Sequence, residues 1–244
     1  MIPFRRILFA VDLSEPSRRA VPYVKAMAER FHSEVFVLHV LEAPTAMYAP
    51  PEVATWAALT NTAKLKEFRQ QSFEAFIRGE FSPMKVQGEF VEGDAANEIT
   101  TRAHRDNVDL IMMMTHGRGP FRRLLLGSVT AKVLHDCDCP VWTGVHTDDF
   151  TAHDPKRLQL ILGAIDNSEK DAHVIEWAHA FARETSAEVR MVHAESHPDL
   201  VVHDEARTAN ADLVVIGRTH SKLGALRSTA YEIIRQAPCP VISV

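Results

Sequence analysis

The residues with the clearest chemical potential form a glycine-rich segment near the middle of the chain. Residues 115–127 contain three glycines, Gly117, Gly119 and Gly127. Ser128 follows them and begins a stretch whose apolar residues have helical spacing. Glycines let backbone N–H groups approach an anion closely, and the first turn of a helix favours negative charge. The segment therefore has the chemistry of a phosphate-binding loop. Glycine-rich loops in α/β proteins also serve as plain tight turns, so spacing alone leaves both interpretations open.

A carboxylate and three arginines accompany this segment. Asp12 ends the apolar run of residues 7–11, and a carboxylate at a strand end can accept a hydrogen bond from a ribose hydroxyl or an adenine amino group. Arg118, Arg122 and Arg123 add positive charge to the loop. The loop is not a Walker loop, because no Gly-Lys-Ser/Thr follows it, and no GxGxxG follows the first apolar run.

Alternating strand and helix patterns must position these residues. Short runs rich in branched apolar residues indicate strands, and apolar positions at helical spacing indicate helices. Strands are expected at residues 7–11, 35–40, 85–91, 110–114 and 141–145, and helices at 17–30, 53–78, 95–105 and 128–136. This alternation predicts a doubly wound α/β layer sandwich with a parallel sheet. Ligands bind such sheets beyond the carboxyl ends of the strands, which is where Asp12 and the glycine-rich segment lie.

The chain contains this pattern twice. Residues 7–40 align with residues 161–194 at a constant offset of 154, which places Asp12 on Asp166. The offset falls to 103 at the fourth strand and to 100 at the last strand, so the second copy lacks 51 residues after its second strand and three more in the later loop. The two copies are therefore expected to have arisen by duplication.

The repeat predicts two domains of unequal size. The first covers residues 1–145, the polar segment 146–157 is the linker, and the second, shortened domain covers residues 158–244. Strands of the second domain are expected at residues 158–165, 188–194, 212–217 and 240–244. Because this domain lacks one helix and one strand, it has little apolar cover, and we expect it to depend on the first domain for stability.

Composition excludes several classes of protein. The chain has 244 residues, of which 46% are hydrophobic and 24% charged, with a net charge of -5 and no long run of one sign. These values argue against disorder and against a nucleic-acid or membrane-surface coat. No run approaches the roughly 18 apolar residues of a membrane span, and Asp12 interrupts the first apolar run before it reaches signal-peptide length. A cytoplasmic location is expected.

Other reactive residue types carry no assignment. The segment from His135 to Cys139 contains metal-ligand residue types, but its spacing fits no standard zinc site, so no metal site is expected. The three cysteines do not form a disulfide framework and are expected to be reduced. His39 and His193 occupy equivalent strand positions, where a histidine with one satisfied ring nitrogen is expected. Spacing supports no catalytic constellation, so no catalytic residue is assigned.

The whole pattern resembles the universal stress protein family, as a tandem pair. ATP-binding members of that family carry an Asp after the first strand and GxxGx9G(S/T) after the fourth. Gly117, nine residues and Gly127-Ser128 reproduce most of this motif, and Gly93-Asp94 and His39-Val40 also look like the family, as does the segment 139–141. The resemblance implies Rossmann-like, adenine nucleotide alpha hydrolase-like domains.

By this resemblance the first domain would bind ATP, accompanied by Mg²⁺. The residues around adenine and ribose would be Ala10, Val11, Asp12, Val40, Met113 and Met114. The residues that hold the phosphates would be Gly117, Arg118, Gly127, Ser128 and Val129. Met114 departs from the family, since it stands where the motif has its first glycine, and a side chain there would narrow the site.

The second copy departs further from the motif. Gly217 keeps the first glycine, but His220 and Arg227 replace the other two, so we expect at most one nucleotide per chain. In the family the last strands of two subunits pair. The resemblance thus implies that residues 141–145 and 241–244 pair within this chain as an internal pseudo-dimer, with a further homodimer left open.

Three functional hypotheses follow. The first is a regulatory or protective protein of the stress response, which binds ATP in its first domain and acts through a protein partner of unknown identity. The second is a scaffold that binds no nucleotide because Met114 blocks the site. The third is a slow ATPase.

Overall fold

The structure is a computed structural model that describes residues 4–42, 51–115, 126–144, 154–194, 197–218 and 229–244, with residues 51–62 described by their backbone alone. Strands and helices alternate along the chain. The first half contains β1 (Arg6–Ala10), α1 (Glu15–Phe31), β2 (Glu34–Leu41), α2 (Pro51–Phe81), β3 (Gln87–Glu92), α3 (Ala95–Arg105), β4 (Leu110–Met114), α4 (Ser128–Asp136) and β5 (Val141–Gly144). The second half contains β6 (Leu160–Ile165), α5 (Asp171–Thr185), β7 (Glu188–His193), α6 (Pro198–Thr208), β8 (Leu213–Ile216), α7 (Thr229–Gln236) and β9 (Val241–Ser243).

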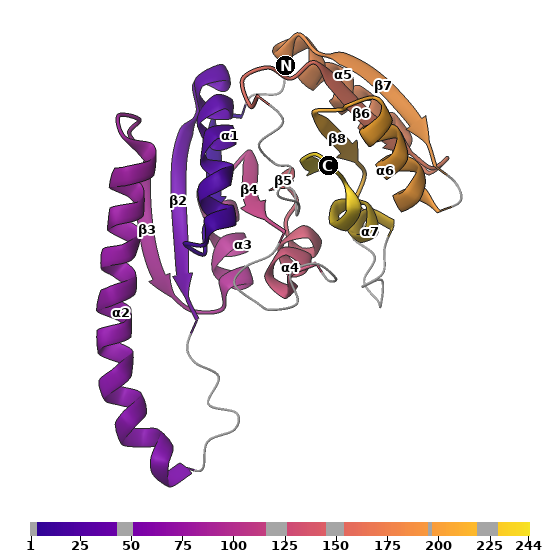
Figure 1. Ribbon diagram of the computed structural model, residues 1–244. Coiled ribbons are helices and arrows are strands. Elements are labelled where there is room, and N and C mark those ends of the chain that lie inside the picture. Colours follow the sequence, from indigo (N-terminus) through magenta and orange to yellow (C-terminus); the bar gives the residue numbers. More distant parts are fainter. Residues whose placement is uncertain (1–3, 43–50, 116–125, 145–153, 195–196, 219–228) are drawn as a thin grey trace.

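The described strands form one nine-stranded sheet in the order β3-β2-β1-β4-β5-β9-β8-β6-β7 (Figure 1). The order β5-β4-β1-β2 recurs as β9-β8-β6-β7, as the sequence repeat predicts. Strands within each half are parallel, whereas β5 and β9 are antiparallel, with Trp142 opposite Ile242. The expected pairing of the two last strands is therefore present, and it joins the halves into a single sheet.

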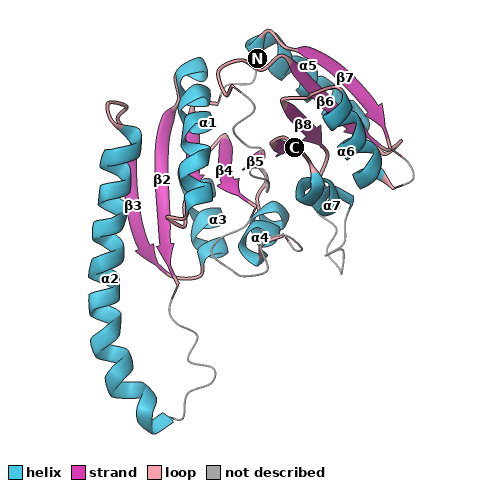
Figure 2. Cartoon of the chain, in the orientation of Figure 1, coloured by secondary structure: helices cyan, strands magenta, loops and turns pink. Residues whose placement is uncertain are grey.

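Helices cover both faces of this sheet (Figure 2). Alternate residues of a strand point to opposite faces, so that Ile7 and Phe9 of β1 pack with α1, α2 and α5, whereas Leu8 and Ala10 pack with α3, α4, α6 and α7. We call these the α1 face and the α4 face. On each face the hydrophobic cluster continues from the first half into the second.

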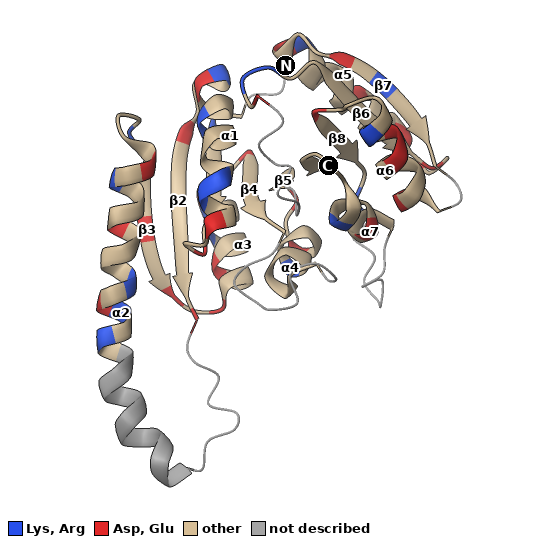
Figure 3. Cartoon of the chain, viewed as in Figure 1, with Lys and Arg blue, Asp and Glu red and all other residues tan. Residues whose placement is uncertain are grey.

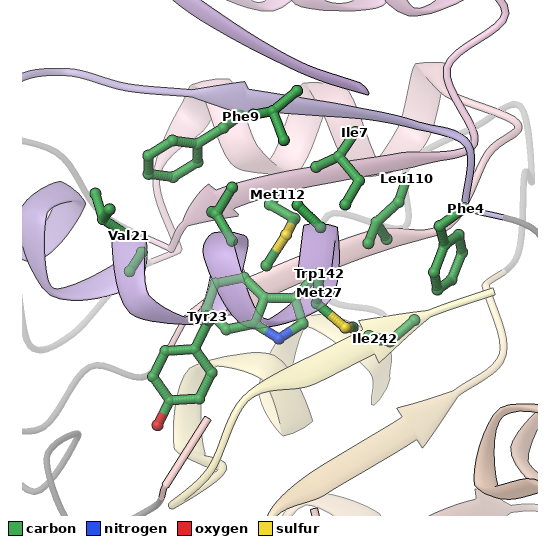
Figure 4. Packing of buried hydrophobic residues seen from close by; sticks show 14 of the residues in the cluster. Phe4, Ile7, Phe9, Val21, Tyr23, Met27, Leu110, Met112, Trp142 and Ile242 are labelled. Carbon is green, nitrogen blue, oxygen red and sulfur yellow. The ribbon is translucent and has the colours of Figure 1, made fainter. Parts of the chain in front are cut away.

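Aromatic rings fill the α1 face where the halves meet. The ring centroid of Phe4 lies 6.1 Å from that of Trp177 and 6.0 Å from that of Phe181. Phe31 of α1 stacks on Phe181 with 5.9 Å between centroids. Ile242 of β9 is buried in the same cluster, beside first-half side chains (Figure 4). The halves thus share one core on this face, which is the arrangement expected if the second half depends on the first.

The predicted elements are present with small shifts at their ends. The helix predicted at residues 53–78 runs from Pro51 to Phe81, and the strand predicted at residues 85–91 is β3, Gln87–Glu92. The helix and strand that the second copy lacks correspond to α2 and β3. Consequently β7 lies at the edge of the sheet, whereas its counterpart β2 pairs with β3 on that side. Most of the predicted linker lies outside the described residues.

Charged residues of both signs occur along α1 and along the described side chains of α2 (Figure 3). Neither helix therefore presents a stripe of one sign, consistent with the mixed charge of the sequence. Of the helices in the described part of the chain, none combines the length and the apolar character needed to span a membrane.

Candidate functional site

Asp12 follows β1 in a turn that fixes one of its carboxylate oxygens. The next residue, Leu13, has a left-handed backbone with φ 61°, which is uncommon for a bulky side chain. In this turn Oδ1 of Asp12 accepts hydrogen bonds from the backbone N–H of Ser14 at 3.0 Å and from the hydroxyls of Ser14 at 2.5 Å and Ser17 at 2.7 Å. Burial of the Leu13 side chain on the α1 face offsets the backbone strain. The start of α1 thus holds the carboxylate rigidly.

The second oxygen, Oδ2 of Asp12, is buried and has no hydrogen-bond partner among the described residues. A buried acceptor left without a donor costs about 1–3 kcal/mol, and such atoms are rare in folded proteins. The atom lies at the carboxyl end of β1, next to β4 in the sheet. Asp12 therefore presents a rigid acceptor at the edge where sheets of this kind bind ligands.

The first turn of α4 lies at the same edge and is held against the end of β4. The backbone N–H of Gly127 donates to the carbonyl of Thr115 at 3.0 Å, and the hydroxyl of Thr130 donates to the carbonyl of Met114 at 3.1 Å. Because β4 pairs directly with β1, these contacts bring the start of α4 to the strand end that carries Asp12.

The start of α4 has no acceptor of its own. The first N–H groups of a helix have no partner within the helix, and Gly127, the N-cap of α4, has no side chain that accepts from them. The first turn of α4 also contains no acidic residue. Within the described residues the first turn of α4 therefore has no side-chain cap, and the helix dipole favours an anion there.

The other helices whose first-turn side chains are described have an acidic residue at the N-cap or in the first turn. Glu15 stands in the first turn of α1, and Asp94 caps α3 by accepting from the backbone N–H of Asn97 at 2.8 Å. Asp171 and Asp199 stand in the first turns of α5 and α6. Among these helices α4 is the exception, and it is the helix whose start the glycine-rich segment predicted to bind phosphate.

Met114 packs against the neighbouring strand β5. It belongs to the α1 face and lies over Gly144 of β5, where a Cβ atom added to that glycine would come within 2.4 Å of the Met114 Sδ. Ala10 and Met113 are buried on the opposite α4 face, against which Val40 and Val129 are partly buried. The Met114 side chain therefore does not occupy the space beside these four residues.

The remaining predicted residues divide as follows. Val11 is buried on the α1 face, and its carbonyl lies 2.7 Å from Nδ1 of His39. His39 is buried next to the rings of Phe73 and Phe90, and burial lowers its pKa, so the ring is neutral and satisfied at one nitrogen, as expected. Gly117 and Arg118, together with Arg122, Arg123 and His220, lie outside the described residues.

The equivalent edge of the second half contains a cavity of about 450 Å³. Asp166, Glu169 and Asp171 contribute three carboxylates to its lining. Lys170 also lines the cavity, but its ammonium group donates to the carbonyl of Arg218. Its carboxylates outnumber its lysine, and that lysine already donates to a backbone carbonyl. The cavity is therefore a poor environment for a phosphate chain.

Four residues with roles at the first site were not among the predicted site residues. Ser14 and Ser17 help to fix Asp12, and Thr115 and Thr130 anchor α4 to β4. The sequence indicates these contacts only by hydroxyl residues near the starts of α1 and α4. Because such residues are common near helix starts, this signal is weak. Among the described residues no cluster of three or more His, Cys, Asp and Glu side chains is arranged to hold a metal ion.

Comparison with known proteins agrees with this architecture. The model of the universal stress protein family matches residues 3–143 and 189–244. Universal stress protein MJ0531 of Methanocaldococcus jannaschii is 31% identical over 139 residues, which cover 57% of this chain and 80% of that protein. Universal stress protein Rv2005c of Mycobacterium tuberculosis is 27% identical over 206 residues, which cover 80% of this chain and 65% of the longer relative.

A solved structure extends the likeness to the whole chain. A universal stress protein from Archaeoglobus fulgidus DSM 4304 superposes with a TM-score of 0.69 and 21% identity, covering 100% of this chain and 97% of that one. At this identity the likeness shows the same fold. Because the two regions matched by the family model cover most of the sequence, this chain belongs to the universal stress protein family.

Proposed function

We propose that this universal stress protein binds one ATP, with Mg²⁺, at the carboxyl edge of β1 and β4, and that occupancy of this site regulates its contacts with a protein partner in the cytoplasm during stress. The observation that carries the proposal is that two groups of complementary chemistry lie at that edge. One is the buried Oδ2 of Asp12, and the other is the uncapped start of α4.

The two groups differ in the chemistry they offer. Oδ2 of Asp12 accepts hydrogen bonds, and a ribose hydroxyl or the adenine amino group can supply the donor that it lacks. The start of α4 offers N–H groups and a positive dipole end to the phosphates. A nucleotide carries both complementary parts on one molecule, whereas a bare phosphate would leave Asp12 unsatisfied.

The surrounding apolar residues suit the base. Ala10 and Met113 are buried on the α4 face, and Val40 is partly buried against the same cluster. Since Met114 packs over Gly144 on the opposite face, it does not support the scaffold hypothesis in which its side chain blocks the site. Gly117 and Arg118 are assigned to the phosphates by their place in the family motif.

We assign the second domain a structural role. Its cavity is lined by three carboxylates, and its copy of the motif lacks two of the three glycines. Asp166, the counterpart of Asp12, has an exposed side chain whose Oδ1 accepts from the backbone N–H of Ser168 at 3.2 Å. These features favour one nucleotide per chain, bound in the first domain.

Replacement of Asp12 by asparagine tests the acceptor. The amide oxygen can take over the bonds from Ser14 and Ser17, but the amide nitrogen cannot accept a hydrogen bond in place of Oδ2. We expect the dissociation constant for ATP to rise about 10- to 100-fold, as for loss of a hydrogen bond to a charged group. Titration calorimetry measures the affinity, and chemical denaturation checks that the fold is retained.

The matched control is Asp166→Asn in the second half. It makes the same chemical change at the equivalent position, and we expect the affinity for ATP to stay at the wild-type value. Equal affinities of the Asp12→Asn and Asp166→Asn variants would remove Asp12 from the site.

A further inference from the structure

Two cysteines lie side by side in the turn between α4 and β5. Cys137 is buried, Cys139 is partly exposed, and their side chains form a hydrogen bond with each other. The turn lies at the opposite end of α4 from the proposed phosphate site and leads into β5, the strand that pairs with the second half. Nothing in the proposed nucleotide site uses these thiols.

A buried arginine from the second half lies against the same turn. Arg218 follows β8 and is 7% exposed. Its guanidinium donates to the carbonyl oxygens of Cys139 at 2.6 Å and Leu134 at 3.2 Å, while its Nε has no acceptor among the described residues. Neutral carbonyls do not balance a buried positive charge, which favours an anion nearby.

The two thiols lie close to this charge, as does the carboxylate of Asp138. The hydrogen bond from Cys137 lowers the pKa of Cys139, and the positive charge of Arg218 lowers it further. The same hydrogen bond, together with burial, raises the pKa of Cys137. Of the two thiols, Cys139 is therefore the one that loses its proton more readily, and a thiolate is the reactive nucleophile.

The second copy contains a natural comparison. Cys239 occupies the position equivalent to Cys139, but Ala237 replaces Cys137, so Cys239 has no thiol neighbour at that position. Cys239 is 1% exposed, and burial raises its pKa. One chain thus holds an activated cysteine pair and an inert cysteine in equivalent turns.

We propose that Cys137 and Cys139 form a peroxide-reactive thiol pair that closes to a disulfide. The Cys139 thiolate attacks a hydroperoxide oxygen, the O–O bond breaks, and the leaving oxygen takes a proton from solvent, giving a sulfenic acid and water or an alcohol. The sulfur of Cys137 then attacks the sulfenic sulfur, an S–S bond replaces the S–O bond, and the released oxygen leaves as water with the Cys137 proton. The two thiols lose two electrons, which reduce the hydroperoxide.

Peptide mapping of the full-length protein tests the proposal. Trypsin cuts after Lys132, Lys156 and Arg235, so Cys137 and Cys139 fall in one peptide and Cys239 in another. After treatment of the reduced protein with hydrogen peroxide, we expect the peptide of residues 133–156 to lose two hydrogen atoms. Cys239 should still react with an alkylating reagent once the protein is denatured. If the peptide of residues 133–156 is alkylated at both cysteines, as in the untreated protein, the proposal is wrong.

Three variants distinguish the roles of Cys137, Arg218 and Cys239. In Cys137→Ser, the Cys139 sulfenic acid should accumulate and be trapped by a cyclic 1,3-diketone. In Arg218→Gln, oxidation of the pair should slow by at least about tenfold, whereas Cys239→Ser should oxidise at the wild-type rate. Unchanged oxidation in Arg218→Gln would contradict the activating role of that residue, and the wild-type map remains decisive if that variant does not fold.

Discussion

Replacement of Gly127 by aspartate is expected to weaken ATP binding by at least about 100-fold, because a fixed like charge beside the phosphates costs several kcal/mol. Gly127 is the N-cap of α4, with φ -58° and ψ 141°, an extended backbone that any residue can adopt. An aspartate there accepts from the N–H groups that we assign to the phosphates. The variant therefore supplies from within the chain the negative group that α4 lacks.

The same substitution is expected to leave the fold intact. Aspartate caps a helix better than glycine by a few tenths of a kcal/mol, and its charge adds about 0.3–1 kcal/mol with the helix dipole. The free energy of unfolding should thus stay constant or rise while affinity falls. Titration calorimetry and chemical denaturation of one preparation measure both quantities.

Gly127→Asn is the matched control, since asparagine caps the helix without carrying charge. Its affinity for ATP should lie between those of the wild type and Gly127→Asp, and the difference between the two variants isolates the electrostatic contribution. Wild-type affinity in Gly127→Asp would show that the start of α4 does not hold the phosphates.

A large loss of stability is expected when the contact between the halves is weakened. Phe181→Ala is expected to lower the free energy of unfolding by about 3–5 kcal/mol, the usual cost of emptying a buried phenylalanine site. Phe181 is fully buried and contacts the rings of Phe4, Phe31 and Trp177. Two of those rings belong to the first half, so the loss acts on both halves.

The number of unfolding transitions distinguishes one core shared by both halves from two independent cores. With a shared core, the variant should unfold in one transition at lower denaturant concentration. Leu200→Ala is the control, because Leu200 is 50% exposed and its truncation should change the stability by no more than about 0.5 kcal/mol. Separate unfolding of the second half in Phe181→Ala, with the first half unchanged, would contradict the shared core.

Much of the fold was predictable from local pattern. The bounds of α3, β4 and α4 match the prediction, because caps, apolar runs and a glycine mark their ends in the sequence. The end of α2 was predicted three residues early, because the buried Phe81 extends the helix by a turn toward Pro83. The resemblance to the family, together with the repeat, correctly predicted that the last strands of the two copies pair.

The candidate site was predictable only in part. Asp12 and the start of α4 follow from residue type and position at strand ends. The free Oδ2 of Asp12, in contrast, depends on how Ser14 and Ser17 occupy the other oxygen. The position of Met114 depends on a glycine 30 residues later in the neighbouring strand. Arg218 meets the Cys137 turn only because β5 and β9 pair, so nothing in its local sequence indicates that contact.

One nucleotide is expected to bind per chain, in the first half. Calorimetric titration of nucleotide-free protein with ATP and Mg²⁺ measures this stoichiometry, after a denatured sample has been checked for nucleotide carried through purification. Saturation near one ATP per chain is expected, lost in Gly127→Asp and retained in Asp166→Asn. Absence of binding by the nucleotide-free wild type, or saturation at two per chain, would contradict it.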